Sequence, residues 1–273
     1  AIHHAFKMCV PFIDKGIEAS TFRTLFSLGI AHSPSADQVE DQLATFPRAL
    51  AVTRHQVERF SPETRAILEI REERDLALIE KMYAGSVPLG TMDTSGWAVQ
   101  YTRELDMAND SRLFPPRQRW EERGYSPDQY GSWIGPDGDA ALPVYEGRSV
   151  GQFDFQRKGW VSGKGRRAVW REIPWREKTF EPQYLMSRTD FLEKVEQPLR
   201  WKIAFMDVAA SNVERTMIAT PLSGLPCGNS APVLTIKEGD IQATFVVSAF
   251  LNSFAYDFFM RRRCTGLHLN WFV

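Results

Sequence analysis

The residues best suited to chemistry are concentrated in one segment, 157–178. It contains eight arginines and lysines against two glutamates, and three tryptophans are interleaved with them. Cationic side chains neutralise phosphates and flat aromatic rings stack on bases, so this composition suits a nucleic acid. A solvated basic loop has the same local composition, and the sequence leaves both interpretations open. The basic residues are Arg157, Lys158, Lys164, Arg166, Arg167, Arg171, Arg176 and Lys178, and the tryptophans are Trp160, Trp170 and Trp175.

Motifs that carry out catalysis on a base or a phosphate are missing. The sequence has no (N/D)PP(Y/F) tetrapeptide to hold an extruded base, and no glycine-rich turn after a strand to hold a cofactor. It also lacks GxGxxG, a Walker lysine motif and HExxH, and the stretch Gly163–Gly165 is only a flexible basic loop. We therefore expect no catalytic residue and no cofactor-binding residue in this chain.

The cysteines and the net charge limit the remaining classes of protein to which this chain could belong. Cys9, Cys227 and Cys264 are far apart, have no CxxC partner, and have no histidine at a spacing typical of a metal site. This spacing suggests neither a disulfide framework nor a zinc site, so no metal ligand is expected, and a reducing cytoplasm fits best. The net charge of −1 hides the basic segment because acids elsewhere balance it, so it does not exclude nucleic acid.

One stretch just before the basic segment, PVYEGRSVGQFDF from Pro143 to Phe155, has a recognisable pattern. It resembles the plYEGKMIxQFDHR signature of the large adenine-specific DNA methyltransferases found in type IIG restriction-modification enzymes and in the phage-defence systems BREX and DISARM. In that family the signature follows the methyltransferase domain, where the chain enters the target-recognition region. This sequence departs from it twice. Arg148 stands where lysine is usual, which keeps the charge but changes the donor, and Phe155-Gln156 stands where His-Arg is expected.

Four further stretches are similar to the same family, in the same order along the chain. They resemble nPNTRtcpifRsrrDaelxxxiYxxvP, MTNDSxLF, sTNeRT and LNSfvfDyxaRqkvgGtHLNfFil, and they lie at 61–88, 105–114, 211–216 and 251–273. The resemblance implies a site-specific adenine-N6 DNA methyltransferase that uses S-adenosylmethionine, with double-stranded DNA and other defence-system subunits as partners. Because the catalytic motifs are missing, we expect this chain to be a fragment that recognises the DNA target and is inactive alone.

The charge pattern and the resemblance together define the predicted DNA contacts. Arg215 could contact a phosphate, or it could pair with an acid and hold two strands together, and the structural role is favoured slightly. Asn109-Asp110-Ser111 is expected to be a turn rather than a catalytic cluster. The arginines at 261–263 complement the dipole of a helix end. The candidate DNA-binding residues are Arg148, Arg157, Lys158, Lys164, Arg166, Arg167, Arg171, Arg176 and Arg215.

The elements that must position these residues follow from apolar periodicity and capping signals. The sequence predicts strands at 6–13, 22–30, 201–208, 216–220 and 267–273, a turn at 61–63, and helices at 71–84 and 240–263. Pro221 is expected to close the strand at 216–220, and Asp240 to cap the second helix. That helix is apolar nearly all round, so we expect it in the core, and its polar interruptions argue against a membrane span.

Length and composition predict an α+β fold with two domains. A chain of 273 residues, 43% of them hydrophobic, can bury a sizeable core. We expect residues 1–130 to be the C-terminal part of a methyltransferase-type domain with a connector, 131–141 to be a Pro/Gly-rich linker, and 142–273 to be a mixed α/β target-recognition domain. The alternative function is a protein-interaction or inhibitor-docking module of the same defence complex, with the three tryptophans as interface anchors.

Overall fold

The computed structural model describes residues 15–16, 18–26, 36–45, 49–93, 96–209, 213–237, 240–264 and 268–269. Within these residues every pair of named strands is antiparallel, and helices are interspersed with the strands along the chain. The predicted α+β class is confirmed at this level. The strand predicted at 6–13 lies outside the described residues, as does most of that predicted at 267–273. Of the strand predicted at 22–30, the start is confirmed by a strand at Thr21–Thr24, and residues 27–30 lie outside the described residues.

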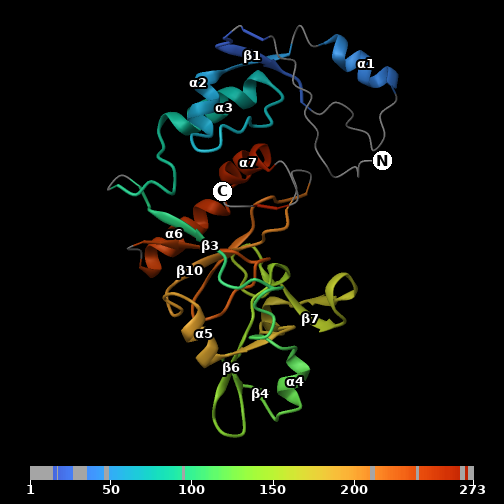
Figure 1. Cartoon of the computed structure of the whole chain (residues 1–273), viewed down its shortest axis with the longest axis vertical. Helices are drawn as coiled ribbons and strands as arrows, with labels where there is room; N and C mark the ends of the chain where they lie inside the picture. The colour runs from blue at the N-terminus through green and yellow to red at the C-terminus, as the bar shows by residue number, and fades with distance from the viewer. Residues whose placement is uncertain are drawn as a thin grey trace.

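The first part of the chain combines a two-stranded sheet with helices (Figure 1). Thr53 begins its second helix through a reciprocal capping box with Gln56. The helix predicted at 71–84 is confirmed, with its start at Glu73, and the predicted turn is confirmed because Ser61 ends the preceding helix. The elements are β1 (Thr21–Thr24), α1 (Ala36–Ala44), β2 (Leu50–Thr53), α2 (Arg54–Phe60) and α3 (Glu73–Ala84).

A four-stranded sheet forms the centre of the molecule. In spatial order its strands are β11 (Ala219–Leu222), β10 (Lys202–Phe205), β12 (Val233–Ile236) and β3 (Val99–Thr102). β3 comes from the part expected to be methyltransferase-derived, whereas the other three come from the part expected to recognise DNA, so hydrogen bonds of this sheet cross the predicted division. Pro221 does not close a strand but lies within β11, opposite Ile203. Proline is tolerated there because β11 is an edge strand.

A second four-stranded sheet lies where a linker was expected. Its strands, in order, are β4 (Ser126–Pro127), β5 (Trp133–Ile134), β6 (Ala140–Pro143) and β9 (Leu185–Ser187). The prediction of a linker at 131–141 is therefore wrong, because β5 and the start of β6 lie inside it. Trp133 is buried against Trp120, and Gly131 and Gly138 have φ of 86° and 79°. The glycines form the tight turns of a short meander rather than a flexible connection. The rest of the domain division stays a prediction.

Two helices, α6 (Ile241–Leu251) and α7 (Phe254–Arg263), replace the single helix predicted from 240 to 263. The Asp240 cap is confirmed, since its carboxylate accepts the N–H of Ala243 at 2.8 Å. The helices meet at a bend of 65°. Residues of both pack on the central sheet, but α6 is not buried all round, because Phe245 and Val246 are 50% and 55% exposed. Within the described ranges no single helix is long and apolar enough to cross a membrane, although α6 and α7 meet that criterion when taken together.

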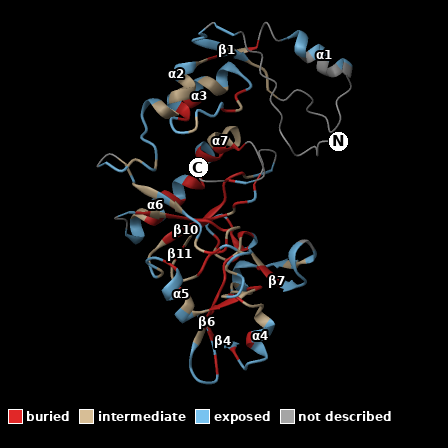
Figure 2. Ribbon diagram, in the orientation of Figure 1, coloured by how far each residue is buried: buried red, intermediate tan, exposed pale blue. Residues whose placement is uncertain are grey.

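The basic segment forms a separate two-stranded sheet, β7 (Lys158–Ser162) paired with β8 (Val169–Glu172). Figure 1 shows this hairpin extending sideways from the body, and Figure 2 shows its outer end exposed while buried residues gather in the central strands. Short 3₁₀ turns flank it at Gly147–Ser149 (η2), Gly165–Arg167 (η3) and Trp175–Glu177 (η4). Two short helices, α4 (Arg117–Glu121) and α5 (Arg188–Lys194), complete the elements of this part of the structure.

Candidate nucleic-acid interface

The middle of the β7–β8 hairpin is stabilised by two tryptophans. Trp160 and Trp170 face each other across the strands; Trp160 is 5% exposed and Trp170 is half-buried. The indole N–H of Trp160 donates to the carbonyl of Gly163 at 3.0 Å, and the guanidinium of Arg117 lies 4.9 Å from its ring centre. Two of the three tryptophans expected to anchor a partner therefore stabilise the hairpin itself.

The outer end of the hairpin, residues 163–168, is a basic loop. Gly163 has φ of 78°, and an added Cβ would collide with the carbonyl of Arg167, so the sharp turn requires glycine. Lys164 and Arg167 are exposed and have no side-chain partner in the described part of the chain. The side chain of Arg166 lies outside the described residues. The loop thus presents at least two cations to solvent.

A second group of cations lies at the inner end of the hairpin. Arg157 precedes β7, and its carbonyl accepts the N–H of Ile173, just after β8, at 3.0 Å. Arg176 follows two residues after Pro174, in η4. Arg157 and Arg176 are exposed, and neither forms an ion pair among the residues that the structure describes. Trp175, beside Arg176, is 66% exposed.

The structure removes Arg171 from the set of available phosphate contacts. Its guanidinium forms a two-point interaction with Glu181, with the Nε to Oε2 distance at 2.9 Å, and Glu177 lies 3.9 Å away. The hydrogen bond to Glu181 raises the pKa of the Arg171 guanidinium. The prediction that Arg171 binds DNA is therefore not supported by its position, because its fork of donors is already occupied. Lys158 is weakly paired, with Glu172 at 4.0 Å.

Arg148 lies beside the hairpin, in η2. Its guanidinium is exposed, 5.8 Å from the ring centre of Trp170, and it donates at 3.5 Å to the carbonyl of Ala168. The neighbouring Glu146 is different: its Oε1 is buried without a hydrogen-bond partner. Burial raises the pKa of the Glu146 carboxyl to about 7, against the opposing charge of Arg148. Arg148 is thus placed with the exposed cations, and Glu146 carries less negative charge at neutral pH than an ordinary glutamate because its pKa is raised.

Arg215 has the structural role. Its guanidinium donates to the carbonyls of Asn252 and Ser253 at the bend between α6 and α7, lies 3.7 Å from Asp257, and stacks on Phe254 at 4.7 Å. The side chain is only 13% exposed. Its burial and these contacts support the structural role, so Arg215 is left out of the set of exposed cations.

The family-like stretches meet at this same bend. The side-chain amide of Asn252 donates to the carbonyl of Ala219 at 2.9 Å, while its oxygen accepts the N–H of Ala219 at 3.1 Å. The carboxylate of Asp257 accepts the N–H groups of Thr216 and Met217 at 2.7 and 3.0 Å. Gln152, from the PVYEGRSVGQFDF stretch, donates to the carbonyl of Asn252 at 3.0 Å. These motif residues connect β11 to the two helices and are structural.

The arginines that end α7 also have intramolecular partners. Arg262 pairs with Asp75 of α3 at 2.9 Å and lies 3.7 Å from the ring centre of Phe258. Arg263 donates to the carbonyl of Phe60 at 3.0 Å, and Arg261 pairs with Asp257 at 2.9 Å. Arg262 and Arg263 thus join α7 to the first part of the chain, whereas Arg261 pairs within α7, and all three complement the helix dipole.

Arg262→Ala is expected to lower the free energy of unfolding by about 2 kcal/mol, because it removes charge-assisted hydrogen bonds from a side chain that is 19% exposed. Duplex DNA affinity should not change. Urea unfolding and a DNA titration of the same variant measure both. Lys81→Ala, on the exposed side of α3, is the control and should be neutral in both measurements. A loss of affinity at unchanged stability would show that Arg262 contacts DNA.

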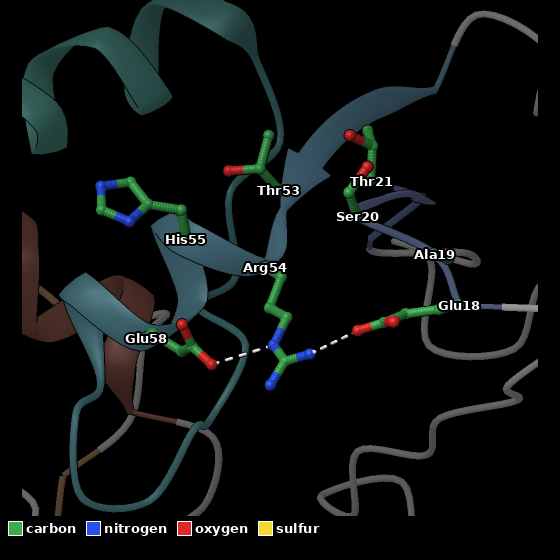
Figure 3. Close-up of a pocket in the computed structure, with 8 residues that line it drawn as sticks. All are labelled: Glu18, Ala19, Ser20, Thr21, Thr53, Arg54, His55 and Glu58. Carbon is green, nitrogen blue, oxygen red and sulfur yellow. Dashed lines mark hydrogen bonds and ion pairs between the residues drawn. The ribbon is translucent and has the colours of Figure 1, made fainter.

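A pocket lies apart from the hairpin, in the first part of the chain (Figure 3). Its residues come from β1 with the segment before it, and from α2 with the end of β2. Arg54 lies between Glu58 and Glu18, at 3.0 and 3.1 Å, as Figure 3 shows. The hydrogen bond with Arg54 lowers the pKa of Glu58. Since two acids neutralise its arginine, the pocket has no free cation to attract an anion. Its lining comprises Glu18, Ala19, Ser20, Thr21, Thr53, Arg54, His55 and Glu58.

One polar pair was not expected from the sequence. Nδ1 of His268 lies 2.6 Å from the carboxylate of Asp207, and Arg103 approaches the same carboxylate at 4.0 Å. Asp207 and His268 are 61 residues apart in sequence, so no local signal connects them. Among the described residues no hydroxyl or thiol contacts this histidine, so we assign no nucleophile. Within the described ranges, no group of three or more His, Cys, Asp or Glu residues could hold a metal ion.

The exposed cations of the hairpin and of the turns beside it, together with Trp175, form the best-supported candidate site, which we call the basic hairpin surface. It comprises Arg148, Arg157, Lys164, Arg167, Trp175 and Arg176. Comparison with protein-family models and with curated proteins gives no match to this chain.

Proposed function

We propose that this chain recognises a DNA target for a site-specific, S-adenosylmethionine-dependent adenine-N6 DNA methyltransferase of a restriction-modification or phage-defence system. The observation that carries the proposal is the β7–β8 hairpin, whose outer loop presents exposed cations without intramolecular partners. Five stretches of the sequence resemble this methyltransferase family and occur in the same order as in the family, and this supports the choice of family. In this proposal methyl transfer and cofactor binding belong to another part of the protein, and the location is cytoplasmic.

The dimensions of the hairpin suit double-stranded DNA. The major groove is about 12 Å wide and admits a two-stranded β-ribbon. β7 has five residues and, at about 3.3 Å per residue, spans roughly 16 Å. Its outer loop carries Lys164 and Arg167, while Arg157 and Arg176 lie near its inner end. Because phosphates on one strand recur every 3.4 Å or so along the axis, the two groups are about five nucleotides apart. The ribbon could thus enter the groove while both groups contact the backbone.

A protein-docking module is the second candidate, and one observation favours it. α6 exposes an apolar face that includes Phe245, Val246 and Phe250. Trp160, Trp170 and Trp175 cannot all serve as interface anchors of such a module, because Trp160 is buried. Ionic strength separates the two functions, since DNA binding releases counterions and weakens steeply with salt, whereas apolar docking does not.

Lys164→Ala and Arg167→Ala are each expected to reduce the slope of log affinity against log salt by about 0.9 for duplex DNA. A phosphate contact carries no base identity, so each variant should weaken binding to specific and random duplexes alike. A base-reading residue would instead cost roughly 1 to 3 kcal/mol and relax preference at one base pair. Titrations of both duplexes at several salt concentrations measure the slopes.

Arg74→Ala is the matched control, because Arg74 is an exposed cation on α3, away from the hairpin. It should leave the slope unchanged. If Lys164→Ala and Arg167→Ala behave like Arg74→Ala, the hairpin loop is a solvated surface and the proposal fails. Binding of another protein that is insensitive to salt would favour the docking function.

A further inference from the structure

Trp175 is the most exposed tryptophan in the described part of the chain. It is 66% exposed, compared with 43% for Trp97 and 5% for Trp133 and Trp160. It begins η4 directly after Pro174, whose carbonyl accepts the N–H of Glu177 at 2.9 Å. Proline fixes its own φ and so restrains the backbone that enters this turn. A large aromatic ring is therefore held at the surface by a defined turn rather than by a loose loop.

A fixed cation supports the ring of Trp175. The ammonium of Lys178 lies 4.8 Å from the ring centre. Lys178 itself is 9% exposed and is bound by Asp154 at 2.7 Å and by the carbonyls of Gln156 and Ile173, both at 2.8 Å. A cation held by three oxygens has little freedom, and its attraction to the π-system restrains the ring in turn. Because 66% of Trp175 is exposed, the restrained ring remains accessible for stacking.

The charges around Trp175 indicate the kind of molecule that would cover it. Arg176 is its neighbour in sequence, and Arg157 is connected through the backbone of Ile173. Both arginines are exposed and without ion pairs among the described residues. Glu177 is the nearby acid, and it faces Arg171 at 3.9 Å. An apolar protein surface would have to desolvate these cations, whereas a nucleic acid strand offers phosphates to the arginines and a flat base to the ring.

We propose that Trp175 is a stacking platform for an unpaired base of a nucleic acid strand whose phosphates bind Arg157 and Arg176. This inference rests on the proposed function in DNA binding and goes beyond it by naming an unpaired base as the preferred ligand. In a fully paired duplex each base is stacked between the neighbouring base pairs, so its flat faces are covered. Only an unpaired or displaced base exposes a face on which a protein ring can stack. The basic hairpin surface then binds DNA that contains an unpaired base more tightly than fully paired DNA, whatever the identity of that base.

The experiment compares two 20-base-pair probes that differ in one central feature. One is fully paired and the other has three unpaired thymines in one strand. The protein is expected to bind the second probe about 5- to 100-fold more tightly. Trp175→Ala should abolish this preference, so that the two probes bind this variant with equal affinity. Trp175→Phe should keep part of it, whereas Trp175→Leu, which retains apolar volume without a π-face, should not. Trp97→Ala, at the other exposed tryptophan, is the control and should keep all of it.

The outcomes separate this inference from the proposed function. If both probes bind with a strong salt dependence but Trp175→Ala keeps the wild-type preference, the stacking role is wrong and DNA binding stands. The same conclusion follows if Trp175→Ala weakens both probes equally. If neither probe binds in a salt-dependent manner, the stacking role and the proposed function both fail. Circular dichroism of each variant verifies its fold, and agreement between Ala and Leu excludes a folding artefact at this exposed position.

Discussion

Lys202→Met is expected to lower the free energy of unfolding by about 3 to 5 kcal/mol, the largest effect of any single change considered for this protein. Lys202 is 3% exposed, and its ammonium donates to both carboxylate oxygens of Glu104, at 2.6 and 2.7 Å. It also donates to the carbonyl of Leu225 at 2.6 Å. Glu104 is 6% exposed and accepts the N–H of Cys227 at 3.0 Å. Methionine would fill the space but leave a buried carboxylate without its cation. Urea unfolding of the wild type and the variant measures the difference.

An exposed ion pair supplies the control for this prediction. Arg71 contacts Glu69 at 2.7 Å, with 53% of the Arg71 side chain exposed. Arg71→Met should change stability by less than about 1 kcal/mol, because solvent screens such pairs. The double variant Lys202→Met with Glu104→Gln should recover part of the loss by removing the orphaned charge. Equal effects of Lys202→Met and Arg71→Met would contradict the role assigned to the buried pair.

Glu146→Gln is expected to stabilise the protein above pH 7 and to have little effect below pH 4.5. Burial raises the pKa of the folded-state carboxyl from 4.5 to about 7. Between these values the folded state retains a proton that the unfolded state has released, so the free energy of unfolding falls as pH rises through 7. The full difference is about 3 kcal/mol. Glutamine does not titrate, so the variant should avoid this loss.

Unfolding curves of the wild type and of Glu146→Gln at pH 4.5, 6 and 8 would measure this effect. The two curves should separate progressively as pH rises. Glu193→Gln, at an exposed position of α5, is the control and should run parallel to the wild type throughout. A wild-type protein that is equally stable at pH 6 and pH 8 would show that the Glu146 carboxyl finds a partner in solution.

The local features of the fold could be predicted because their causes are local. The helix at 73–84 has its apolar residues and its acidic first turn within one segment, and the Asp240 cap lies next to the N–H that it accepts. The break between α6 and α7 has a distant cause. Asn252 contacts Ala219 across 33 residues, and no pattern within the helix records that contact. The meander around Trp133 was mistaken for a linker because tight turns and flexible connections share glycine and proline.

The same distinction applies to the candidate site. Lys164 and Arg167 are exposed, because a six-residue basic loop with two glycines has no large apolar side chain with which to bury itself. Arg171 resembles them in sequence, yet Glu181, ten residues later, occupies its guanidinium. Arg215 is held by a bend that only the folded chain creates. Charge density therefore predicted where the cations gather, whereas their pairing depends on tertiary contacts.

The position of β3 has a practical consequence for dividing this chain. β12 lies between β10 and β3, and all four residues of β3 pair with it, from Val99 opposite Ile236 to Thr102 opposite Val233. A polypeptide that begins at residue 142 would leave one side of β12 with open N–H and C=O groups next to buried apolar side chains. Such an edge is a template on which another chain can add a strand, and it promotes aggregation. A recombinant piece of this chain that contains the central sheet should therefore begin upstream of Val99, so that its own β3 closes the edge.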